Sequence, residues 1–358
     1  MAKRLILAIN PGSTSTKFGL FEEENLVFEK TLRHTPDELA IFTRITDQFG
    51  FRKELILKEL TDRGIDFKAI AAVVGRGGLI KPIKSGVYVV NDEMKKDLIT
   101  SPFGEHASNL GGLIADDIAS SLESAKAFIV DPVVVDEMEP VARLSGHPEI
   151  SRLSIFHALN HKAVARSYAA SIGKKYEDLN LVVAHMGGGI SVGAHSKGMV
   201  IDVNNAFGGE GPFSPERSGG LPSSQLVDLC FSGKYSKSEI KTMLVGKGGM
   251  VAYLGTNNFK EICELADNGN DKAILVRDAV AYQIGKEIGA MAAVLKGKVD
   301  AIILTGGLAY QKSNIDSIKS MVESIAEVVV FPGEDELRAL AYSGLSALKK
   351  ETEIKIYK

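Results

Sequence analysis

Short apolar segments separated by turns of Gly, Ser, Glu and Asn recur along the chain, and this pattern predicts β-strands. The first group of segments lies at 5–10, 17–21 and 26–31. The second group lies at 181–186, 191–195 and 199–203. Small residues and the acidic turn EEEN connect the first group, and GGG and SKG connect the second. Apolar runs with such connections are typical of a meander, so each group predicts three consecutive strands.

Two further pairs of segments follow these groups in the same order. The segment 69–79 resembles 299–308, because each is a short apolar strand that runs into Gly-Gly-Leu. Likewise 125–132 resembles 326–332, and each ends in Pro. Amphipathic stretches between the strands predict helices at 36–60, 105–122, 273–295 and 313–325. The repeated order predicts an α/β fold with a duplicated βββαβαβ domain; the alternative is that such echoes arise by chance in any α/β protein.

The duplication and a length of 358 residues both favour two domains. We expect an N-terminal domain at 1–155, joined by a C-terminal helix at about 340–358, and a C-terminal domain at 156–339. Two such domains would face each other across a cleft. The small-residue loops that follow the first strand of each group would then meet in that cleft.

Composition and charge restrict the function. The net charge is −3 and basic residues are interleaved with acidic ones, which argues against binding to nucleic acid. Apolar runs stay well below the roughly 18 residues of a membrane span. The start MAKRLILAIN has no apolar core or cleavage site of a secretory signal. With only Cys230 and Cys263 present, we expect a cytoplasmic protein with neither a nucleic-acid nor a membrane partner.

Three small-residue loops are candidates for binding a nucleotide. NPGSTSTK at 10–17 offers backbone N–H groups, hydroxyls and one cation to a phosphate, and AHMGGGIS at 184–191 offers a second set. LTGG at 304–307 would let a flat ring or a ribose approach the backbone. The spacing of a P-loop and that of a dinucleotide fingerprint are both absent from the sequence, so the predicted nucleotide site is of another kind.

These motifs resemble a known family. NPGSTSTK is similar to the N-x-G-S-S-S-x-K opening of the acetate and butyrate kinases, FHALNHKAVA to their F-H-G-T-S-H segment, HMGGGIS to H-L-G-x-G-x-S, and PERSGGLP to their T-R-S-G segment. VGRGGLIKPI and YLGTNN resemble the butyrate kinases in particular. The family lies in the actin, hexokinase and Hsp70-like superfamily. The resemblance therefore implies duplicated βββαβαβα ribonuclease H-like domains that face each other across a nucleotide cleft.

The resemblance also implies an activity. It implies a kinase that uses ATP and Mg²⁺ to convert a short-chain carboxylate, butyrate first, into an acyl phosphate by reversible, direct in-line transfer. A branched-chain fatty acid or another carboxylate is the alternative acceptor. More remote alternatives are a sugar kinase and an ATP-gated protein of the actin kind. The family further implies a homodimer or a larger homo-oligomer.

Site residues follow from the same motifs. The resemblance implies catalytic roles for Arg76, Asp131, His161 and Arg217. It implies contacts to ATP and its phosphates for Asn10, Gly12, Ser13, Ser15, Lys17, His185, Gly187, Gly188, Gly189, Asn258, Gly306 and Gly307. It implies a Mg²⁺ environment at Asn10 and Glu336, or Asp335. The chain departs from the family at Asn258, Lys260 and Gly188, where the family has Asp, Arg and Asn.

The residues themselves fit an anionic acceptor. A carboxylate, with a pKa of roughly 4 to 5, is already ionised at neutral pH and needs cations rather than a general base. Arg76 and Arg217 supply fixed charge and a planar fork. A sugar kinase would need a base, for which Asp131 is the candidate. Structural roles stay open here: ion pairing for the arginines, a turn for Asp131, and packing for His157 and His185.

Overall fold

The computed structural model describes residues 4–358, so residues 1–3, the start of the segment considered as a signal, lie outside the described part. The chain forms two compact units. Unit 1 comprises Met1–Val135 and Asp335–Lys358, and unit 2 comprises Asp136–Glu334. Residues 136–155 therefore belong to the second unit, and residues 335–339 to the first, whereas the sequence-based boundaries placed both segments the other way.

Hydrogen bonds explain where residues 136–155 lie. The backbone N–H of Glu139 donates to the carbonyl of Ile201 (3.0 Å), and Arg152 pairs with Asp202 (2.9 Å). Both partners lie in strand β11, an edge strand of the unit 2 sheet. The segment 136–155 thus covers the edge of a sheet whose strands begin only at Asn180. A contact between segments this far apart does not show in the local sequence pattern.

Unit 1 contains a seven-stranded sheet in the order β14-β5-β6-β4-β1-β2-β3. Its strands are β1 (Leu5–Pro11), β2 (Ser15–Glu22), β3 (Asn25–Arg33), β4 (Ile70–Arg76), β5 (Val87–Val89), β6 (Lys126–Val130) and β14 (Ile354–Ile356). Strands β1, β4 and β6 run parallel, whereas β2 and β3 complete the antiparallel meander. The predicted strands at 5–10, 17–21, 26–31 and 125–132 are confirmed, and 69–79 is a strand as far as Arg76.

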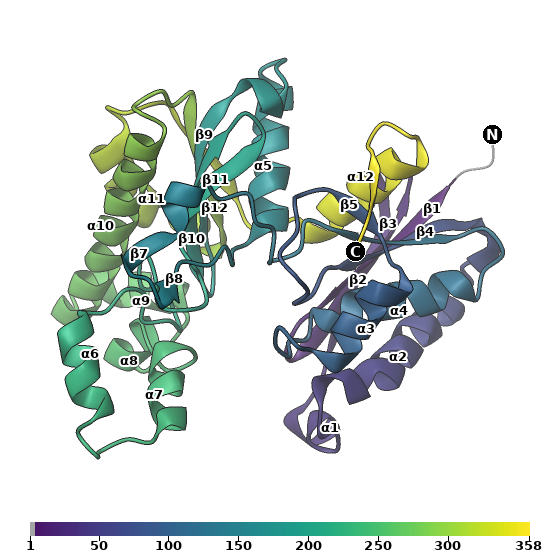
Figure 1. The fold of residues 1–358 in the computed structure, drawn as a ribbon, viewed down its shortest axis with the longest axis horizontal. Coiled ribbons are helices and arrows are strands. Elements are labelled where there is room, and N and C mark those ends of the chain that lie inside the picture. The colour runs from purple at the N-terminus through teal and green to yellow at the C-terminus, as the bar shows by residue number, and fades with distance from the viewer. Residues whose placement is uncertain (1–3) are drawn as a thin grey trace. The chain divides into compact units, whose positions relative to one another are not determined.

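Helices cover both faces of the unit 1 sheet. They are α1 (Pro36–Ala40), α2 (Phe49–Asp62), α3 (Asp92–Thr100), α4 (Asn109–Ser120) and α12 (Glu336–Leu348), with the 3₁₀ turns η1 (Ile45–Gln48) and η2 (Phe67–Ala69). Gly75 of β4 meets α4, and its neighbour Val74 meets α12. Because successive residues of a strand point to opposite faces, α4 and α12 lie on opposite sides (Figure 1). The helix predicted at 36–60 is interrupted between α1 and α2.

Unit 2 repeats this topology with five strands in the order β11-β10-β9-β12-β13. They are β9 (Asn180–Met186), β10 (Ile190–Ser196), β11 (Met199–Val203), β12 (Ala301–Gly306) and β13 (Val328–Pro332). This order matches β3-β2-β1-β4-β6, with the same directions. The predicted duplication is therefore confirmed. A small hairpin is formed by β7 (Leu144–His147) and β8 (Ile150–Ser151), which the sequence pattern did not predict.

The apolar side chains of the unit 2 sheet alternate between two cores. Leu181 and Val183 pack with Ala165 of helix α5, whereas Val182 and Ala184 pack with Ile284 of helix α10. These helices lie on opposite sides of the strands (Figure 1). The helices of the unit are α5 (Ala158–Ser171), α6 (Ser223–Cys230), α7 (Lys237–Leu244), α8 (Met250–Leu254), α9 (Phe259–Asp267), α10 (Asp271–Val294) and α11 (Lys312–Val322). Its 3₁₀ turns are η3 (Pro140–Arg143), η4 (Tyr176–Asp178) and η5 (Gly307–Tyr310).

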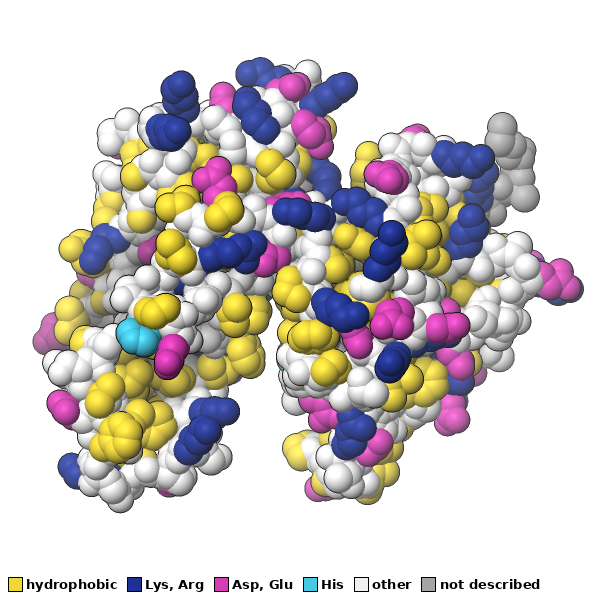
Figure 2. Space-filling view, in the orientation of Figure 1, with side chains coloured by type: hydrophobic (Ala, Val, Ile, Leu, Met, Phe, Trp, Pro, Cys, Tyr) yellow, Lys and Arg dark blue, Asp and Glu magenta, His cyan; other side chains and the backbone are white. Residues whose placement is uncertain are grey.

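Charged side chains are mixed on the surface. On the face shown in Figure 2, Lys and Arg lie interspersed with Asp and Glu over both units. This distribution agrees with the net charge of −3. Across residues 4–358, none of the helices is both long enough and apolar enough to cross a membrane.

Candidate active site

Three predicted site residues lie at neighbouring strand ends in unit 1. Asn10, Arg76 and Asp131 stand at or just after the carboxyl ends of β1, β4 and β6. These strands are parallel neighbours, so their carboxyl ends share one edge of the sheet. In α/β sheets, ligands bind outside this edge. The sequence-based grouping of these residues is thus consistent with the topology.

Asn10, Arg76 and Glu336 form a polar cluster at this edge. Nη1 of Arg76 donates to Oε2 of Glu336 (3.0 Å) and to Oδ1 of Asn10 (3.3 Å). Nδ2 of Asn10 donates to the same Oε2. Glu336 is the first residue of α12 and its side chain is only 7% exposed, against 21% for Arg76. The contacts described for Arg76 use Nη1 alone, so Nε and Nη2 can bind the two oxygens of an anion.

The strand end that carries Arg76 is fixed by a close crossing with α4. A Cβ atom on Gly75 would lie 2.1 Å from the carbonyl oxygen of Gly111, and one on Gly111 would lie 2.2 Å from the carbonyl oxygen of Arg76. Only glycine fits at both positions, because these distances are far below van der Waals contact. The helix backbone therefore packs directly against the backbone of Arg76.

Arg52 of α2 lies beneath the first small-residue loop. It is fully buried and donates to the backbone carbonyls of Gly12 (2.8 Å), Ser13 (3.0 Å) and Ser15 (2.9 Å). The carbonyl of Thr14 accepts from the backbone N–H of His34 (2.9 Å). Burial lowers the pKa of Arg52 to about 10, so it stays a cation at neutral pH.

The loop therefore directs its carbonyls inward. None of the described hydrogen bonds uses the backbone N–H of Ser13 or Thr14, and both residues are exposed. Free N–H groups in a tight turn above a buried cation suit an anion such as a phosphate. Lys17, which was expected to face the phosphates, instead pairs with Glu29 (3.2 Å), and both side chains are more than a third exposed.

Asp131 has a structural partner in unit 1. Its side chain is buried, and Oδ1 accepts from the backbone N–H of Gly86 (2.7 Å) just before β5. Its φ of 37° lies in the left-handed region, which is strained for a residue other than glycine. Strain of this kind is found where surrounding contacts hold the backbone, and here the bond to Gly86 does so. The geometry shows a carboxylate that anchors the turn after β6.

The second small-residue loop joins β9 to β10 in unit 2 and lies against Arg217. Gly188 is exposed, whereas Gly187 and Gly189 are buried. A Cβ atom on Gly189 would lie 2.0 Å from Nη1 of Arg217, so the guanidinium rests directly on this glycine. The same Nη1 donates to the carbonyl of Ala206. Burial lowers the pKa of Arg217, but a guanidinium remains charged at any physiological pH.

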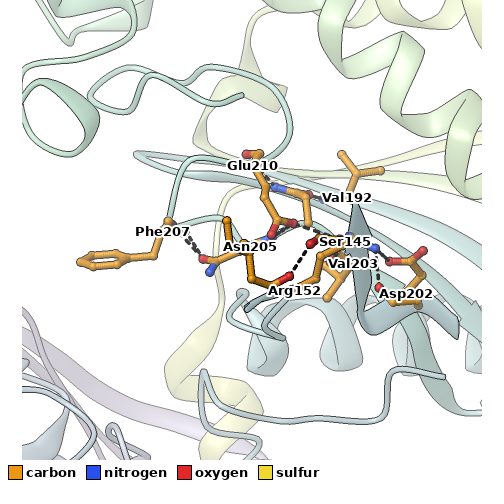
Figure 3. A network of polar contacts seen from close by, with 12 residues as sticks. Ser145, Arg152, Val192, Asp202, Val203, Asn205, Phe207 and Glu210 are labelled. Atoms are coloured by element: carbon orange, nitrogen blue, oxygen red, sulfur yellow. Dashed lines mark hydrogen bonds and ion pairs between the residues drawn. The ribbon is translucent and has the colours of Figure 1, made fainter. Parts of the chain in front are cut away.

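A network around Arg152 supports the segment that holds Arg217. Figure 3 shows Arg152 beside Asp202, Val203 and Glu210. Arg152 donates to the carboxylates of Asp202 (2.9 Å) and Glu210 (3.3 Å) and to the carbonyl of Val203 (3.0 Å). Burial acts to lower the pKa of Arg152, but the two carboxylates outweigh it and raise that pKa. Glu210 also accepts from the backbone N–H of Asn205 (3.1 Å), the residue before Ala206. Sequence reasoning missed Arg152, because its partners are distant in the sequence.

A cavity of about 620 Å³ opens beside the second loop. Its walls come from the β9–β10 turn, the segment before α9 and the turn after β12. The lining residues are Gly187, Gly188, Pro215, Glu216, Asn257, Asn258, Phe259, Lys260, Gly307, Leu308, Tyr310, Gln311 and Glu334. This volume is within the usual range of a small-molecule site. Four sequence-predicted residues line the cavity, namely Gly187, Gly188, Asn258 and Gly307.

Other predicted residues lie behind this cavity or were missed. Gly306 is buried at the end of β12. His185 is buried, with Nδ1 on Asn160 Oδ1 (2.9 Å) and Nε2 3.1 Å from Glu334 Oε1. Sequence reasoning missed Tyr310 and Gln311. Their signal was their position in the sequence, since both come shortly after the Gly-Gly turn that had been identified as an adenosine loop.

Four histidines gather under the second loop. His161 is fully buried, and both of its ring nitrogens have protein partners: Nε2 contacts Ser191 Oγ (2.8 Å) and Nδ1 contacts His195 Nε2 (3.1 Å). Burial, and then the charges of His185 and Lys162, hold the pKa of His161 well below its ordinary value. His157, the residue that precedes α5, is less buried than His161, and its Nδ1 contacts Ser191 Oγ (2.9 Å).

The Asn10–Glu336 pair suits a Mg²⁺ ion that arrives with a nucleotide. Mg²⁺ in such sites takes one or two protein oxygens together with phosphate oxygens and water. Asn10 and Glu336 provide an amide and a carboxylate oxygen, and the described bonds to Glu336 all end on Oε2. Asp335 is less suitable, because its carboxylate caps α12 and pairs with Arg338 (2.8 Å). Among residues 4–358, His, Cys, Asp and Glu do not form a protein-only metal cluster of three or more.

Two ribonuclease H-like units of this topology, with glycine-rich strand turns at the carboxyl edges, define a kinase fold of the actin, hexokinase and Hsp70-like superfamily. Solved structures share this fold. Acetate kinase from Porphyromonas gingivalis superposes with a TM-score of 0.78 at 21% identity, over 96% of this chain and 100% of that one. A propionate kinase from Francisella tularensis gives 0.73 at 19% identity, over 95% and 98%. Acetate kinase from Entamoeba histolytica gives 0.74 at 17% identity, over 94% and 97%.

The family model described as the acetokinase family matches residues 149–350, more than half of the chain. The protein belongs to the acetokinase family. Members of this family are carboxylate phosphotransferases, which in general use ATP and Mg²⁺. The sequence-based assignment to acyl kinases is therefore confirmed at the level of the family.

Proposed function

We propose that the protein is a butyrate kinase, which transfers the γ-phosphoryl group of ATP to butyrate and forms butyryl phosphate reversibly. The observation that carries the choice of acceptor is the pair of motifs VGRGGLIKPI and YLGTNN, at 74–83 and 253–258, which resemble the butyrate kinases. The first motif contains Arg76, and the second leads into the cavity residues Asn257 and Asn258. A branched-chain fatty acid of similar size is the alternative acceptor.

The acceptor needs charge neutralisation rather than deprotonation. Butyrate is ionised at neutral pH, so an in-line attack on the phosphoryl group needs no general base. Arg76 has Nε and Nη2 available for an anion while Glu336 holds Nη1. Arg217, seated on Gly189, is the second cation, and its support by Ala206 means that little reorganisation is needed during the reaction. In this mechanism Asp131 anchors its turn and takes no proton.

The remaining residues bind the nucleotide. In unit 1 the backbone N–H groups of Ser13 and Thr14 bind phosphate oxygens. Asn10 and Glu336 would hold Mg²⁺, which would supply charge neutralisation at the phosphates. In unit 2 the cavity takes the nucleoside part, with Gly307 against the adenosine and Lys260 at the rim. The hydroxyls of Ser13 and Ser15 belong to the same loop, and Lys17, paired with Glu29, adds a positive charge nearby. Gly12 and Gly306 let the backbone turn close to the ligand.

We place the histidine donor to the phosphoryl group at His157 rather than at His161. Both nitrogens of His161 have protein partners and the side chain is fully buried, so it cannot reach a ligand without leaving them. His157 has partial exposure and uses Nδ1 for Ser191. His161 then acts from behind, through Ser191.

A hydroxamate assay tests this function. The enzyme is given ATP, Mg²⁺ and, in turn, acetate, propionate, butyrate, isobutyrate and valerate, and acyl phosphate is trapped with hydroxylamine. We expect the highest kcat/KM with butyrate. Arg217→Ala should lower kcat by about 100- to 1,000-fold, as for other preorganised donors to a transition state. Hydroxamate from none of the acids, with ATP binding intact, would contradict the proposal.

A matched control uses Arg277 of α10. Like Arg217 it is largely buried, but its partners are Asp267 and Asp278 and it does not line the cavity. Arg277→Lys should leave kcat within about twofold of the wild type. Arg217→Lys keeps the charge but loses the planar fork, so it should fall between the wild type and Arg217→Ala. If a branched acid gives a higher kcat/KM than butyrate, that acid is the acceptor, and the proposed phosphoryl transfer itself is unchanged.

A further inference from the structure

Behind His157 runs a continuous line of hydrogen-bonded side chains in unit 2, which we call the imidazole chain. It consists of Ser191, His161, His195 and Tyr176, all of them buried. The links are His157 Nδ1 to Ser191 Oγ (2.9 Å), Ser191 Oγ to His161 Nε2 (2.8 Å), His161 Nδ1 to His195 Nε2 (3.1 Å) and His195 Nδ1 to Tyr176 Oη (2.6 Å). Helix α5, strand β10 and turn η4 each supply members. The family motifs do not account for the far end of this chain.

Chemistry sets the direction of these bonds. A phenol is a strong hydrogen-bond donor and an imidazole lone pair is a strong acceptor, so the hydroxyl of Tyr176 donates a hydrogen bond to Nδ1 of His195. A neutral His195 then carries its proton on Nε2 and donates to Nδ1 of His161. His161 in turn carries its proton on Nε2 and donates to Ser191 Oγ, which leaves the single hydroxyl proton of Ser191 for Nδ1 of His157. At the end of the line, a neutral His157 must carry its proton on Nε2.

The surroundings keep the imidazole chain neutral. Burial holds the pKa of His161 and of His195 well below the ordinary value, and Lys162 lowers both further. Lys162 is itself fully buried and pairs with Glu137 (2.6 Å), which fixes its charge close to the chain. Arg166 also lowers the pKa of His195, and His185, stacked on His157 at 3.9 Å and paired with Glu334, lowers that of His161. An extra proton on the chain is therefore disfavoured.

We propose that the imidazole chain orders its protons in one direction and so positions His157 with its proton on Nε2, ready to donate a hydrogen bond to the phosphoryl group in transfer. Its members are positioning residues, because none of them needs to touch the substrate. The catalytic meaning of this inference rests on the proposed function. The proton positions themselves do not, since they follow from the chain alone.

Nitrogen NMR on protein labelled at its seven histidines tests the proton order directly. Long-range proton–nitrogen spectra at pH 7.5 distinguish the two neutral tautomers and the imidazolium, and single histidine substitutions assign the signals. We expect His157, His161 and His195 all to be neutral with the proton on Nε2. A proton on Nδ1, or an imidazolium, at any of these three residues would overturn the proposal.

Tyr176→Phe tests the far end of the imidazole chain. It removes the donor to His195, and we expect a second tautomer to appear at His157 and kcat to fall by about threefold to tenfold, the worth of one hydrogen bond. KM for ATP should stay within about twofold, because the nucleotide contacts are untouched. Unchanged tautomers together with unchanged kcat would also overturn the proposal.

Tyr168→Phe is the matched control. Tyr168 is buried in the same apolar cluster as Tyr176, but its hydroxyl points to Glu327 at 3.5 Å and lies outside the imidazole chain. Its loss should leave both tautomers and kcat unchanged, and an equal effect of both substitutions would reduce Tyr176 to a packing role and overturn the inference. If no acid yields acyl phosphate, the proposed function fails while the spectra still decide the proton order.

Discussion

At the residue scale, the contact between Gly189 and Arg217 joins a turn to a cation. The guanidinium takes the space that any Cβ at position 189 would need, so glycine at this position is what allows Arg217 to lie against the loop. Neither residue would hold this geometry alone: Arg217 comes from a segment whose position depends on Ala206 and on the Arg152 network.

Gly189→Ala is therefore expected to displace Arg217 while the fold persists. The new Cβ would lie 2.0 Å from Nη1, and the guanidinium, as the end of a flexible side chain, gives way before the buried sheet does. We expect kcat for acyl phosphate formation to fall about 100-fold, close to the effect of Arg217→Ala. Hydroxamate assays of both single variants and the double variant measure it. Additive losses in the double variant would contradict a shared cause.

Gly289→Ala provides the control for that substitution. Gly289 lies in α10, and a Cβ there meets nothing within 4 Å beyond the helix's own backbone. The variant should keep full activity and unfold at equal or slightly higher denaturant concentration, because Ala is the better helix former.

Arg52 shows what residue-level reading misses. In the sequence it stands in an amphipathic helix, where an arginine usually faces water. The structure buries it completely and turns it toward three carbonyls of the first small-residue loop. The spacing of about 40 residues between the helix and the loop gives no signal for this contact, since it depends on how α2 packs on the meander.

At the element scale, the crossing of β4 and α4 carries Arg76. Gly111→Ala should destabilise unit 1, because its Cβ would lie 2.2 Å from a backbone oxygen that cannot move without shifting β4. We expect a loss of about 2–3 kcal/mol in the free energy of unfolding, as for other overpacked cores. Urea titration followed by circular dichroism measures it, as the chain has no Trp for fluorescence.

Gly50→Ala is the matched control within the same unit. Gly50 lies in α2, and a Cβ atom there would meet nothing within 4 Å beyond the helix's own backbone, so Ala should stabilise by up to about 1 kcal/mol. We expect Gly111→Ala to lower the free energy of unfolding and Gly50→Ala to raise it. Equal, small effects of both would show that the β4–α4 crossing can relax.

The elements also show how far sequence pattern reaches. Long strands with regular apolar runs, such as β1 and β9, were predicted within a residue or two, because both sides of each strand are buried and the signal is continuous. Short strands such as β5, β7 and β14 were missed, since three or four residues carry too little pattern. The single helix predicted at 36–60 is two helices in the structure. The break was missed because the apolar period continues across the turn between α1 and α2.

For the candidate site, motifs predicted the loops but not the contacts. The cavity residues at 187, 188, 258 and 307 were expected from the motifs, as were Asn10 and Arg76, which lie at the carboxyl edge of the unit 1 sheet. The imidazole chain was not, because its members look like separate buried residues until η4, β10 and α5 come together. Side-chain partners across elements need tertiary structure, which single-sequence periodicity does not encode.

At the scale of the whole molecule, the buried histidines make stability depend on pH. The pKa values of His161 and His195 are lowered well below 6.5 in the folded state. Below about pH 6.5 the unfolded chain binds protons that the folded chain does not, so stability is full above this pH and is lost as the pH falls. Each group contributes a slope of up to about 1.4 kcal/mol per pH unit.

Urea unfolding at pH 8, 7, 6 and 5.5 checks this dependence. The free energy of unfolding of the wild type should fall steadily below pH 6.5. The free energy of unfolding of His195→Gln should be lower than that of the wild type at pH 8, because the substitution disturbs the imidazole chain. It should then fall less steeply as the pH is lowered. Parallel pH profiles for the two proteins would rule out His195 as a source of the acid sensitivity.

The placement of residues 335–358 in unit 1 affects the order in which the protein can fold during translation. Helix α12, strand β14 and Tyr357, whose hydroxyl is bonded to Asp97 and Lys81, all complete unit 1, yet the ribosome makes them only after the whole of unit 2. Unit 2 is one continuous segment and can finish as soon as it emerges. Unit 1 must wait with the strand faces that α12 covers still open, and Arg76 acquires its partner Glu336 only at that last stage.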